Sequence, residues 1–200
     1  MFTISGEMKI KAVREKGGRV TLYFPDECEY TRLSISLPLY SSIGSPRAGS
    51  VLCEEDIEPL VREDTEWRVV NKALSILAAS DKNKLALRRK LYDAGFSKDA
   101  VDMAVEYCVN LGYIDERRQL SILVSNEANR ALRGRQYIKR KLLSKGYSSS
   151  DIDEVIDSLV EEGEIDFALN FDRLCEKKGA YDAESRKILA YKYGYRQSEV

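Results

Sequence analysis

The chain has 200 residues, of which 44% are hydrophobic and 32% are charged, and its formal net charge is −1. This composition is sufficient for a buried core, and no stretch approaches the roughly eighteen consecutive apolar residues of a membrane helix. The sequence contains no histidine, which excludes the commonest general base and the commonest metal ligand.

The four cysteines lie far apart, and none forms a C-x-x-C pair of the kind that binds zinc. Nucleophile motifs and phosphate-binding glycine loops are also missing. We therefore expect isolated, buried or half-buried thiols, no cofactor, no metal site and no enzymatic activity. Residues 1–11 lack the charged-then-apolar order of a signal peptide. We accordingly expect a soluble cytoplasmic protein, not associated with a membrane, and we expect it to be a monomer.

The first 66 residues predict a small β-rich domain. Short stretches alternate apolar and polar residues, as half-buried strands do. We expect strands over Met8–Val13 and Arg19–Phe24, joined by a glycine turn at Lys16-Gly17-Gly18, and a third strand over Leu33–Leu37. The Gly, Pro and Ser residues of Ser41–Ser50 predict a loop, and the acidic start of Glu54–Arg62 predicts a short helix.

From Trp67 onward the pattern is helical and it repeats. A shift of 51 positions aligns three groups of residues: Arg89-Lys90-Leu91 with Arg140-Lys141-Leu142, Gly95-Phe96-Ser97 with Gly146-Tyr147-Ser148, and Gly112-Tyr113-Ile114-Asp115 with Gly163-Glu164-Ile165-Asp166. The apolar positions between these groups align as well. A poorer third copy begins near Phe167, where residues 190–195 match residues 142–147 at a shift of 48. A fixed period of this length is typical of a helical repeat protein.

The pattern predicts three helices in each copy. In the first, Trp67–Ala79 forms one helix, Asn83 caps a second that ends at Ala94, and Ser97 caps a third through Leu111. Glycines at the stops allow the chain to reverse direction. The sequence therefore predicts a mostly α protein, in which a β-rich domain at 1–66 precedes tandem three-helix repeats in a curved array. The repeats would span 67–115, 116–166 and, incompletely, 167–200.

Charge is distributed unevenly along the chain. Residues 81–146 hold 15 Lys/Arg against 8 Asp/Glu, whereas residues 147–167 hold 8 Asp/Glu and no Lys/Arg. The cations concentrate on or just before the second helix of each full copy, and the spacing of the core leucines directs most of them outward. These candidate binding residues are Lys84, Arg88, Arg89, Lys90, Arg130, Arg133, Arg135, Lys139, Arg140, Lys141 and Lys145.

Two interpretations of these cations are open. They form solvated helix faces that the acidic third helix neutralises, or they form a surface that binds an anion. The anion is then a DNA phosphate track or an acidic patch on a protein, and the sequence does not separate the two. Five aromatic residues accompany the cations, at positions 92, 96, 113, 137 and 147. Phe96 and Tyr147 flank the stop glycines, which favours a core role over base stacking.

The order and spacing of these residues resemble the RecX family. The resemblance covers about 69–200 and depends on Leu87-Arg88-Arg89-Lys90-Leu91, Gly95-Phe96, Gly112-Tyr113-Ile114-Asp115-Glu116 and Lys145-Gly146-Tyr147. It implies a modulator without chemistry of its own that binds the RecA recombinase, lies along the groove of the RecA-DNA filament and reduces recombinase and ATPase activity.

The chain departs from the family pattern at several positions. Ser80 stands where members commonly have arginine, and Asn83 where they have serine, although Asn83 keeps the capping chemistry. Two other classes compete with the RecX reading. A helix-turn-helix-like module would bind DNA without RecA, because short helices with one basic member also describe that fold. A helical scaffold would bind protein alone.

Overall fold

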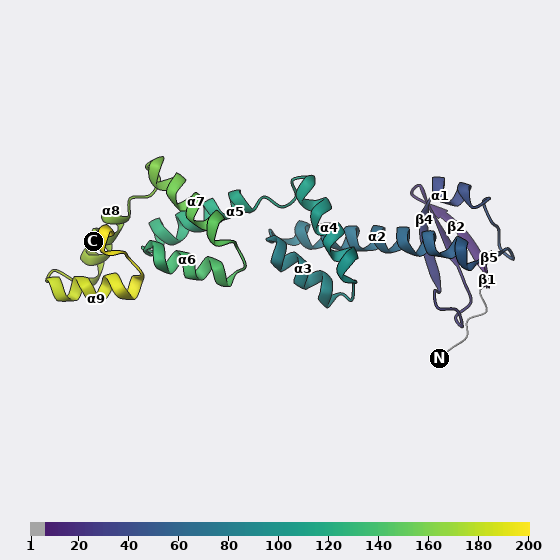
Figure 1. The fold of residues 1–200 in the computed structure, drawn as a ribbon, viewed down its shortest axis with the longest axis horizontal. Helices are drawn as coiled ribbons and strands as arrows, with labels where there is room; N and C mark the ends of the chain where they lie inside the picture. Colours follow the sequence, from purple (N-terminus) through teal and green to yellow (C-terminus); the bar gives the residue numbers. More distant parts are fainter. Residues whose placement is uncertain (1–6) are drawn as a thin grey trace.

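A computed structural model describes residues 7–200. Residues 1–6 lie outside the described residues. They are part of the predicted 1–66 domain and of the N-terminal stretch that lacks a signal-peptide pattern. The molecule is elongated and mostly helical, and a small N-terminal β-sheet region lies at one end (Figure 1). The predicted fold class is confirmed to this extent. None of the described helices has the length and apolarity that crossing a bilayer requires.

The N-terminal region contains two small sheets. In the first, β2 (Ala12–Lys16), β3 (Arg19–Tyr23) and β4 (Arg32–Ser36) are antiparallel in the order β2-β3-β4. Gly17 and Gly18, both at positive φ, form the predicted hairpin turn. In the second, β1 (Glu7–Lys9) pairs with β5 (Val51–Cys53). Helix α1 (Leu37–Ser42) lies between β4 and the loop that leads to β5.

The predicted single strand over Met8–Val13 is wrong. The chain leaves β5 at Ile10, whose backbone bonds the loop at Ser50, and joins β3 where the Lys11 N–H donates to the Tyr23 carbonyl at 2.7 Å. Met8, Ile10 and Val13 still face the core shared with Leu22 and its neighbours. The alternation of apolar and polar residues places Met8 and Ile10 correctly in the core. It fails after Ile10, because Val13 rather than Ala12 faces the core once the backbone has changed its pairing partner.

Helix α2 (Glu54–Ala79) is one continuous helix of 26 residues, where the sequence predicted two separate helices. The linking residues 63–66 contain no helix breaker, and two of their acidic side chains have partners on the sheet. Because the predicted boundary at 66/67 falls inside this helix, the domain limits remain a prediction. The first half of α2 packs on β4, and its second half packs on α4.

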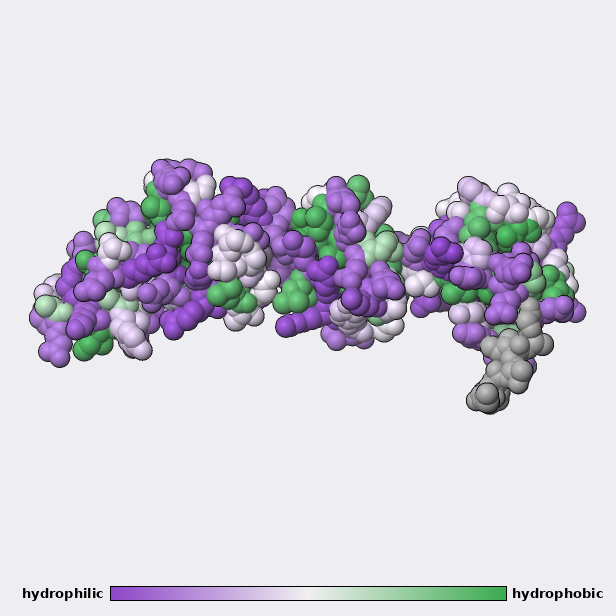
Figure 2. Space-filling view, viewed as in Figure 1, coloured by the Kyte–Doolittle hydropathy of each residue, from purple (hydrophilic) through white to green (hydrophobic). Residues whose placement is uncertain are grey.

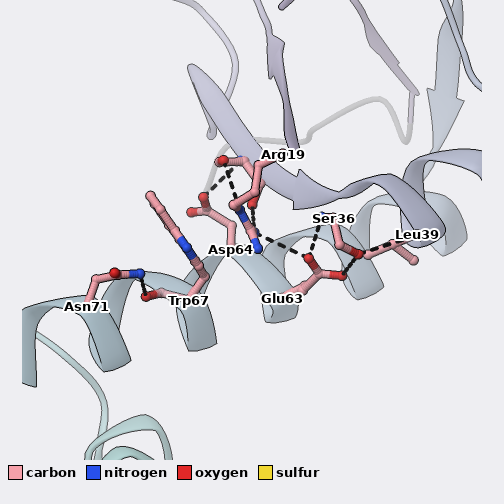
Figure 3. A network of polar contacts seen from close by, with 8 residues as sticks. Arg19, Ser36, Leu39, Glu63, Asp64, Trp67 and Asn71 are labelled. Carbon is pink, nitrogen blue, oxygen red and sulfur yellow. Dashed lines mark hydrogen bonds and ion pairs between the residues drawn. The ribbon is translucent and has the colours of Figure 1, made fainter. Parts of the chain in front are cut away.

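The acidic residues of α2 satisfy the open edge of the three-stranded sheet (Figure 3). The backbone N–H of Ser34 donates to Asp64 Oδ1 at 2.8 Å, and that of Ser36 donates to Glu63 Oε1 at 2.5 Å. Asp64 is only 5% exposed. An unpaired strand edge is a site of aggregation, so these carboxylates both protect β4 and attach the long helix to it.

The remaining helices follow the sequence copies. Helices α3 (Lys84–Asp93) and α6 (Arg135–Ser144) begin 51 residues apart, as do α4 (Lys98–Asn110) and α7 (Ser149–Glu161), and α5 (Glu116–Ser125) and α8 (Phe167–Lys178). A short π-helical turn, η1 (Asn126–Arg130), continues α5. Helix α9 (Ala183–Tyr193) and the 3-10 turn η2 (Gln197–Glu199) complete the described chain. The predicted caps at Asn83 and Ser97 are confirmed, each accepting a backbone N–H.

Two cores hold these helices. One lies between the second half of α2, α3 and α4, around Leu87, Val105 and Cys108. The other joins α5 to α9 continuously, from Leu120 through Ile156 to Phe171 and Tyr195. The region of the third sequence copy is therefore packed into the core of the second.

The N-terminus of α6 rests directly on the backbone that follows α9. The Gly134 N–H donates to the Tyr193 carbonyl at 2.9 Å, and the Gln136 N–H donates to the Gly194 carbonyl at 3.0 Å. A Cβ on Gly134 would lie 2.4 Å from the Gly194 oxygen. Gly194 has φ +75°, and a Cβ there would lie 2.5 Å from the Tyr137 nitrogen. Neither glycine can carry a side chain without separating the two helices.

This contact predicts that Gly134→Ala is more destabilising than Gly163→Ala. Gly134 has φ −78°, which any residue adopts. The loss of unfolding free energy in Gly134→Ala therefore comes from the collision of the new Cβ with the backbone, and it amounts to about 1–3 kcal/mol. Gly163 has φ +75° and open space around it, so its cost is backbone strain alone, about 1–2 kcal/mol. Urea unfolding of both variants measures the difference. The reverse order would contradict the tight contact.

Candidate partner-binding surface

Two of the predicted cations form equivalent internal ion pairs. Arg88 Nε on α3 bonds Asp102 Oδ1 on α4 at 3.0 Å, and Lys139 on α6 pairs with Asp153 on α7. The two ion pairs occupy equivalent positions, because both the cations and the carboxylates are 51 residues apart in the sequence. All four side chains are partly exposed, so each pair contributes about 0.2–1 kcal/mol. Their role is to join the second and third helices of each copy.

Three further cations are held by carboxylates. Lys84 Nζ lies 2.8 Å from Glu116 Oε2, and Lys141 Nζ lies 2.6 Å from Glu127 Oε1. Arg135, whose side chain is 13% exposed, contacts Asp157 Oδ1 at 2.5 Å and Glu199 Oε1 at 3.7 Å. Burial raises the pKa of Glu199, and the backbone N–H of Arg196 and the charge of Arg135 partly offset that shift.

Arg133 is held by aromatic rings. Its guanidinium carbon lies 4.4 Å from the ring centroid of Tyr137 and 4.5 Å from that of Tyr193. Such cation–π contacts contribute about 0.5–2 kcal/mol each, depending on solvent exposure. Arg133 thus reinforces the contact between α6 and α9, and the two rings restrict the access of a partner to its guanidinium.

Five of the eleven predicted residues have no such partner. Within residues 7–200, their side chains are exposed and make no ion pair or hydrogen bond. We call them the exposed basic set: Arg89, Lys90, Arg130, Arg140 and Lys145. The neutralised interpretation therefore holds for Arg135 and Lys139, which pair with the acidic third helix, but not for this set.

Arg89 and Arg140 occupy equivalent positions on α3 and α6, and each has an exposed apolar residue three positions further on. Tyr92 and Leu143 are both 43% exposed. The matching residues of α9 are apolar: Ile188 is 60% exposed and Tyr191 is 90% exposed. Figure 2 shows that the hydrophobic residues of the visible face form separate patches within a mostly hydrophilic surface. At the position of Arg89 and Arg140, α9 therefore carries an apolar residue, although Lys187 and Lys192 of the same helix are exposed.

The spacing between α3 and α6 is fixed by a polar junction. Asn83, which caps α3 through its oxygen, also donates through Nδ2 to the Lys145 carbonyl at 2.8 Å. The Tyr147 hydroxyl donates to Gln119 Oε1 at 3.0 Å, and Gln119 donates in turn to the Lys82 carbonyl at 3.2 Å. Burial, with smaller contributions from Glu116 and Asp81, raises the pKa of Tyr147, so its hydroxyl remains a donor at neutral pH.

Of the five aromatic residues near the cations, three pack against other parts of the protein and two are exposed. Tyr147 is 8% exposed and Phe96 is half-buried against the first helical core, as expected from their positions beside the stop glycines. Tyr137 lies under Arg133. Tyr92 and Tyr113 are exposed.

All four cysteines are free; Cys108 and Cys175 are buried, Cys28 is half-buried, and Cys53 is exposed rather than buried. No cluster of potential metal ligands occurs within residues 7–200.

Sequence reasoning considered the acidic third helix, whose Asp153 and Asp157 hold Lys139 and Arg135, but it missed the other carboxylates that hold cations. The signal for one pair was present, because Arg88 and Asp102 are 14 residues apart and Lys139 and Asp153 repeat that spacing. Glu116, Glu127 and Glu199 gave no such signal, since their contacts depend on how the helices pack. The second hydrogen bond of Asn83, across 62 residues, was equally invisible.

No protein-family model matches this chain. Several curated relatives are named regulatory protein RecX. The relative from Clostridioides difficile is 23% identical over 80% of this chain and 74% of its own length. The one from Clostridium acetobutylicum is 23% identical over 73% of this chain and 65% of its own length, and the one from Listeria monocytogenes is 26% identical over 60% and 45%. The match thus spans less than two thirds of the last two relatives.

Two crystal structures share the fold. One, of a regulatory protein RecX, superposes with a TM-score of 0.70 at 17% identity and covers 96% of both chains. The other, of RecX from Lactobacillus salivarius, has a TM-score of 0.57 at 15% identity and covers 68% of this chain and 91% of its own. At these identities the likeness concerns the fold alone.

The fold defines an elongated, mostly helical protein with a small N-terminal β-region and a set of exposed cations on its second helices. The sequence relatives, which match 60 to 80% of the chain and carry one name, support its assignment to the RecX family. The resemblance seen in the repeated residues is confirmed.

The division between held and exposed cations predicts different stabilities for two alanine variants. Arg135→Ala leaves Glu199, 10% exposed, without its cation, and should lower the free energy of unfolding by about 1–3 kcal/mol. Arg140→Ala removes no contact and should change it by less than about 0.5 kcal/mol. Thermal or urea unfolding measures both. Equal losses would mean that Arg140 has a structural partner.

Proposed function

We propose that this chain is a regulator that docks on RecA or on the RecA-DNA filament through the exposed basic set and lowers recombinase, ATPase and strand-exchange activity. The main support is that five of the eleven candidate cations have no partner within the described chain, whereas carboxylates or aromatic rings hold the other six. Exposed cations retain their charge for an external anion. RecX family membership supports RecA as that partner.

We further propose that residues 67–115, 116–166 and 167–200 act as successive units of a curved array. The 51-residue spacing of α3 and α6, of α4 and α7, and of α5 and α8 supports this division, as do the contacts at Gly134 and at Asn83. Such an array would present Arg89 and Arg140 at a fixed separation along an extended surface. An extended, regularly charged surface is suited to a polymer with its own regular spacing. The function needs no chemistry of its own, and the chain would act as a cytoplasmic monomer.

The test compares two double variants that differ by one position on the same helices. Arg89→Gln/Arg140→Gln removes two exposed charges, and Arg88→Gln/Lys139→Gln removes two paired charges, so both change the net charge equally. The concentration needed to inhibit RecA ATPase and strand exchange should rise about tenfold for the first, equivalent to about 1.4 kcal/mol. It should change less than about twofold for the second. Equal effects would contradict the assignment of the surface.

A DNA-binding module acting without RecA is the second candidate, because exposed arginines also contact phosphates. It predicts that the chain binds a duplex probe without RecA as tightly as it binds the filament. It also predicts that Arg89→Gln/Arg140→Gln weakens both equally. Tight binding only when RecA is present would support the filament proposal instead.

A further inference from the structure

The outer face of the three-stranded sheet carries an unexpected set of side chains. Strand alternation places Val20, Leu22, Leu33 and Ile35 in the core. The strand register then aligns the opposite residues in rows across β2, β3 and β4: Lys16 with Arg19 and Ser36, Arg14 with Thr21 and Ser34, and Ala12 with Tyr23 and Arg32. This face is therefore basic and contains one aromatic ring.

The cations of this face are largely available. Arg14, Lys16 and Arg32 are exposed and make no ion pair within residues 7–200. Arg68, which α2 brings to the same side, is 61% exposed and lies 3.6 Å from Asp64. Arg19 is different, because it bonds Ser34 and Glu63 and so belongs to the sheet edge.

Two aromatic rings lie among these cations. The Arg14 guanidinium carbon is 5.4 Å from the ring centroid of Tyr23. Trp67 projects from α2 beside Arg19, whose guanidinium carbon is 4.7 Å from the indole centroid (Figure 3). The indole remains 41% exposed. Arg19 lies over one face of the indole, and Trp67 also lines a concavity together with Arg32 and Arg68.

The rings and cations line one continuous groove. A concavity of about 400 Å³ is lined by Tyr23, Arg32, Trp67 and Arg68, and a neighbouring one of about 510 Å³ is lined by Lys11, Arg14 and again by Tyr23 and Arg32. Three carboxylates also line these concavities: Glu29 and Asp64 line the first, and Asp26 lines the second. Asp64 accepts a hydrogen bond from the Ser34 N–H. The groove alternates positive charge with aromatic surface, the combination that binds single strands.

We propose that this groove binds single-stranded nucleic acid. One base stacks on Tyr23 and another on the exposed part of Trp67, while Arg14, Arg32 and Arg68 contact the phosphates. A duplex is excluded from this mode, because its bases are already stacked and paired. The site lies on the N-terminal sheet, apart from the exposed basic set, and does not depend on the proposed RecA function.

Trp67 is the only tryptophan in the sequence, so its fluorescence reports this groove alone. The full chain is titrated, without RecA, with oligothymidine and with oligouridine of about 15 nucleotides, and with a DNA duplex of equal length. Saturable quenching by the single strands, at least about tenfold tighter than by the duplex, is the expected result. The tighter of the two oligomers identifies DNA or RNA as the ligand.

Arg14→Glu/Arg32→Glu should weaken the quenching about tenfold and reduce the slope of log affinity against log salt by about 1.4. Arg47→Glu/Arg62→Glu is the matched control. It makes the same change in net charge in the same region, at exposed residues outside the groove, and should leave the affinity unchanged. Circular dichroism verifies that both variants fold. No quenching, equal weakening in both variants, or equal quenching by the duplex would overturn the proposal.

Discussion

The arrangement of the helical region depends on a backbone contact that allows no side chain between its partners. Gly134 begins α6 against the carbonyl of Gly194, and the amide groups of the α6 N-terminus donate to the chain that follows α9. The α3 N-terminus meets the end of α6 through a side-chain hydrogen bond, which Asn83 Nδ2 donates to the Lys145 carbonyl. These two contacts hold α3, α6 and α9 in a defined arrangement. The separation of Arg89 and Arg140 follows from that constraint.

Charge is then distributed according to burial. The cations nearest the helix contacts are held by carboxylates or rings, whereas those further out retain their charge. Surface pairs of this kind add little stability, but they fix which residues face outward. A long helix extends the same principle to the N-terminal region, because the carboxylates of α2 satisfy the edge of β4 and place Trp67 and Arg68 beside the outer sheet face.

Local patterns predicted much of this structure. Capping residues and stop glycines located α3, α4, α6 and α7 closely, since helix starts and stops depend on neighbouring residues. The repeated residues indicated the resemblance to the RecX family, which the similar proteins support. What local patterns could not predict are contacts between distant segments: the pairing of β1 with β5, the continuity of α2 across its acidic residues, and which candidate cations are held. Five of the eleven are held by carboxylates, Arg133 is held by aromatic rings, and five remain exposed. The candidate surface was accordingly predicted as one set where the structure divides it.

The central claim is that the exposed basic set engages a RecA filament by charge. Co-sedimentation of the full chain with RecA filaments on DNA across a salt series tests it most directly. The account predicts that the bound fraction falls steadily as salt rises, and that the chain remains in the supernatant when filaments are omitted. Binding that does not change between low and high salt would contradict it, because the contact would then be apolar rather than ionic.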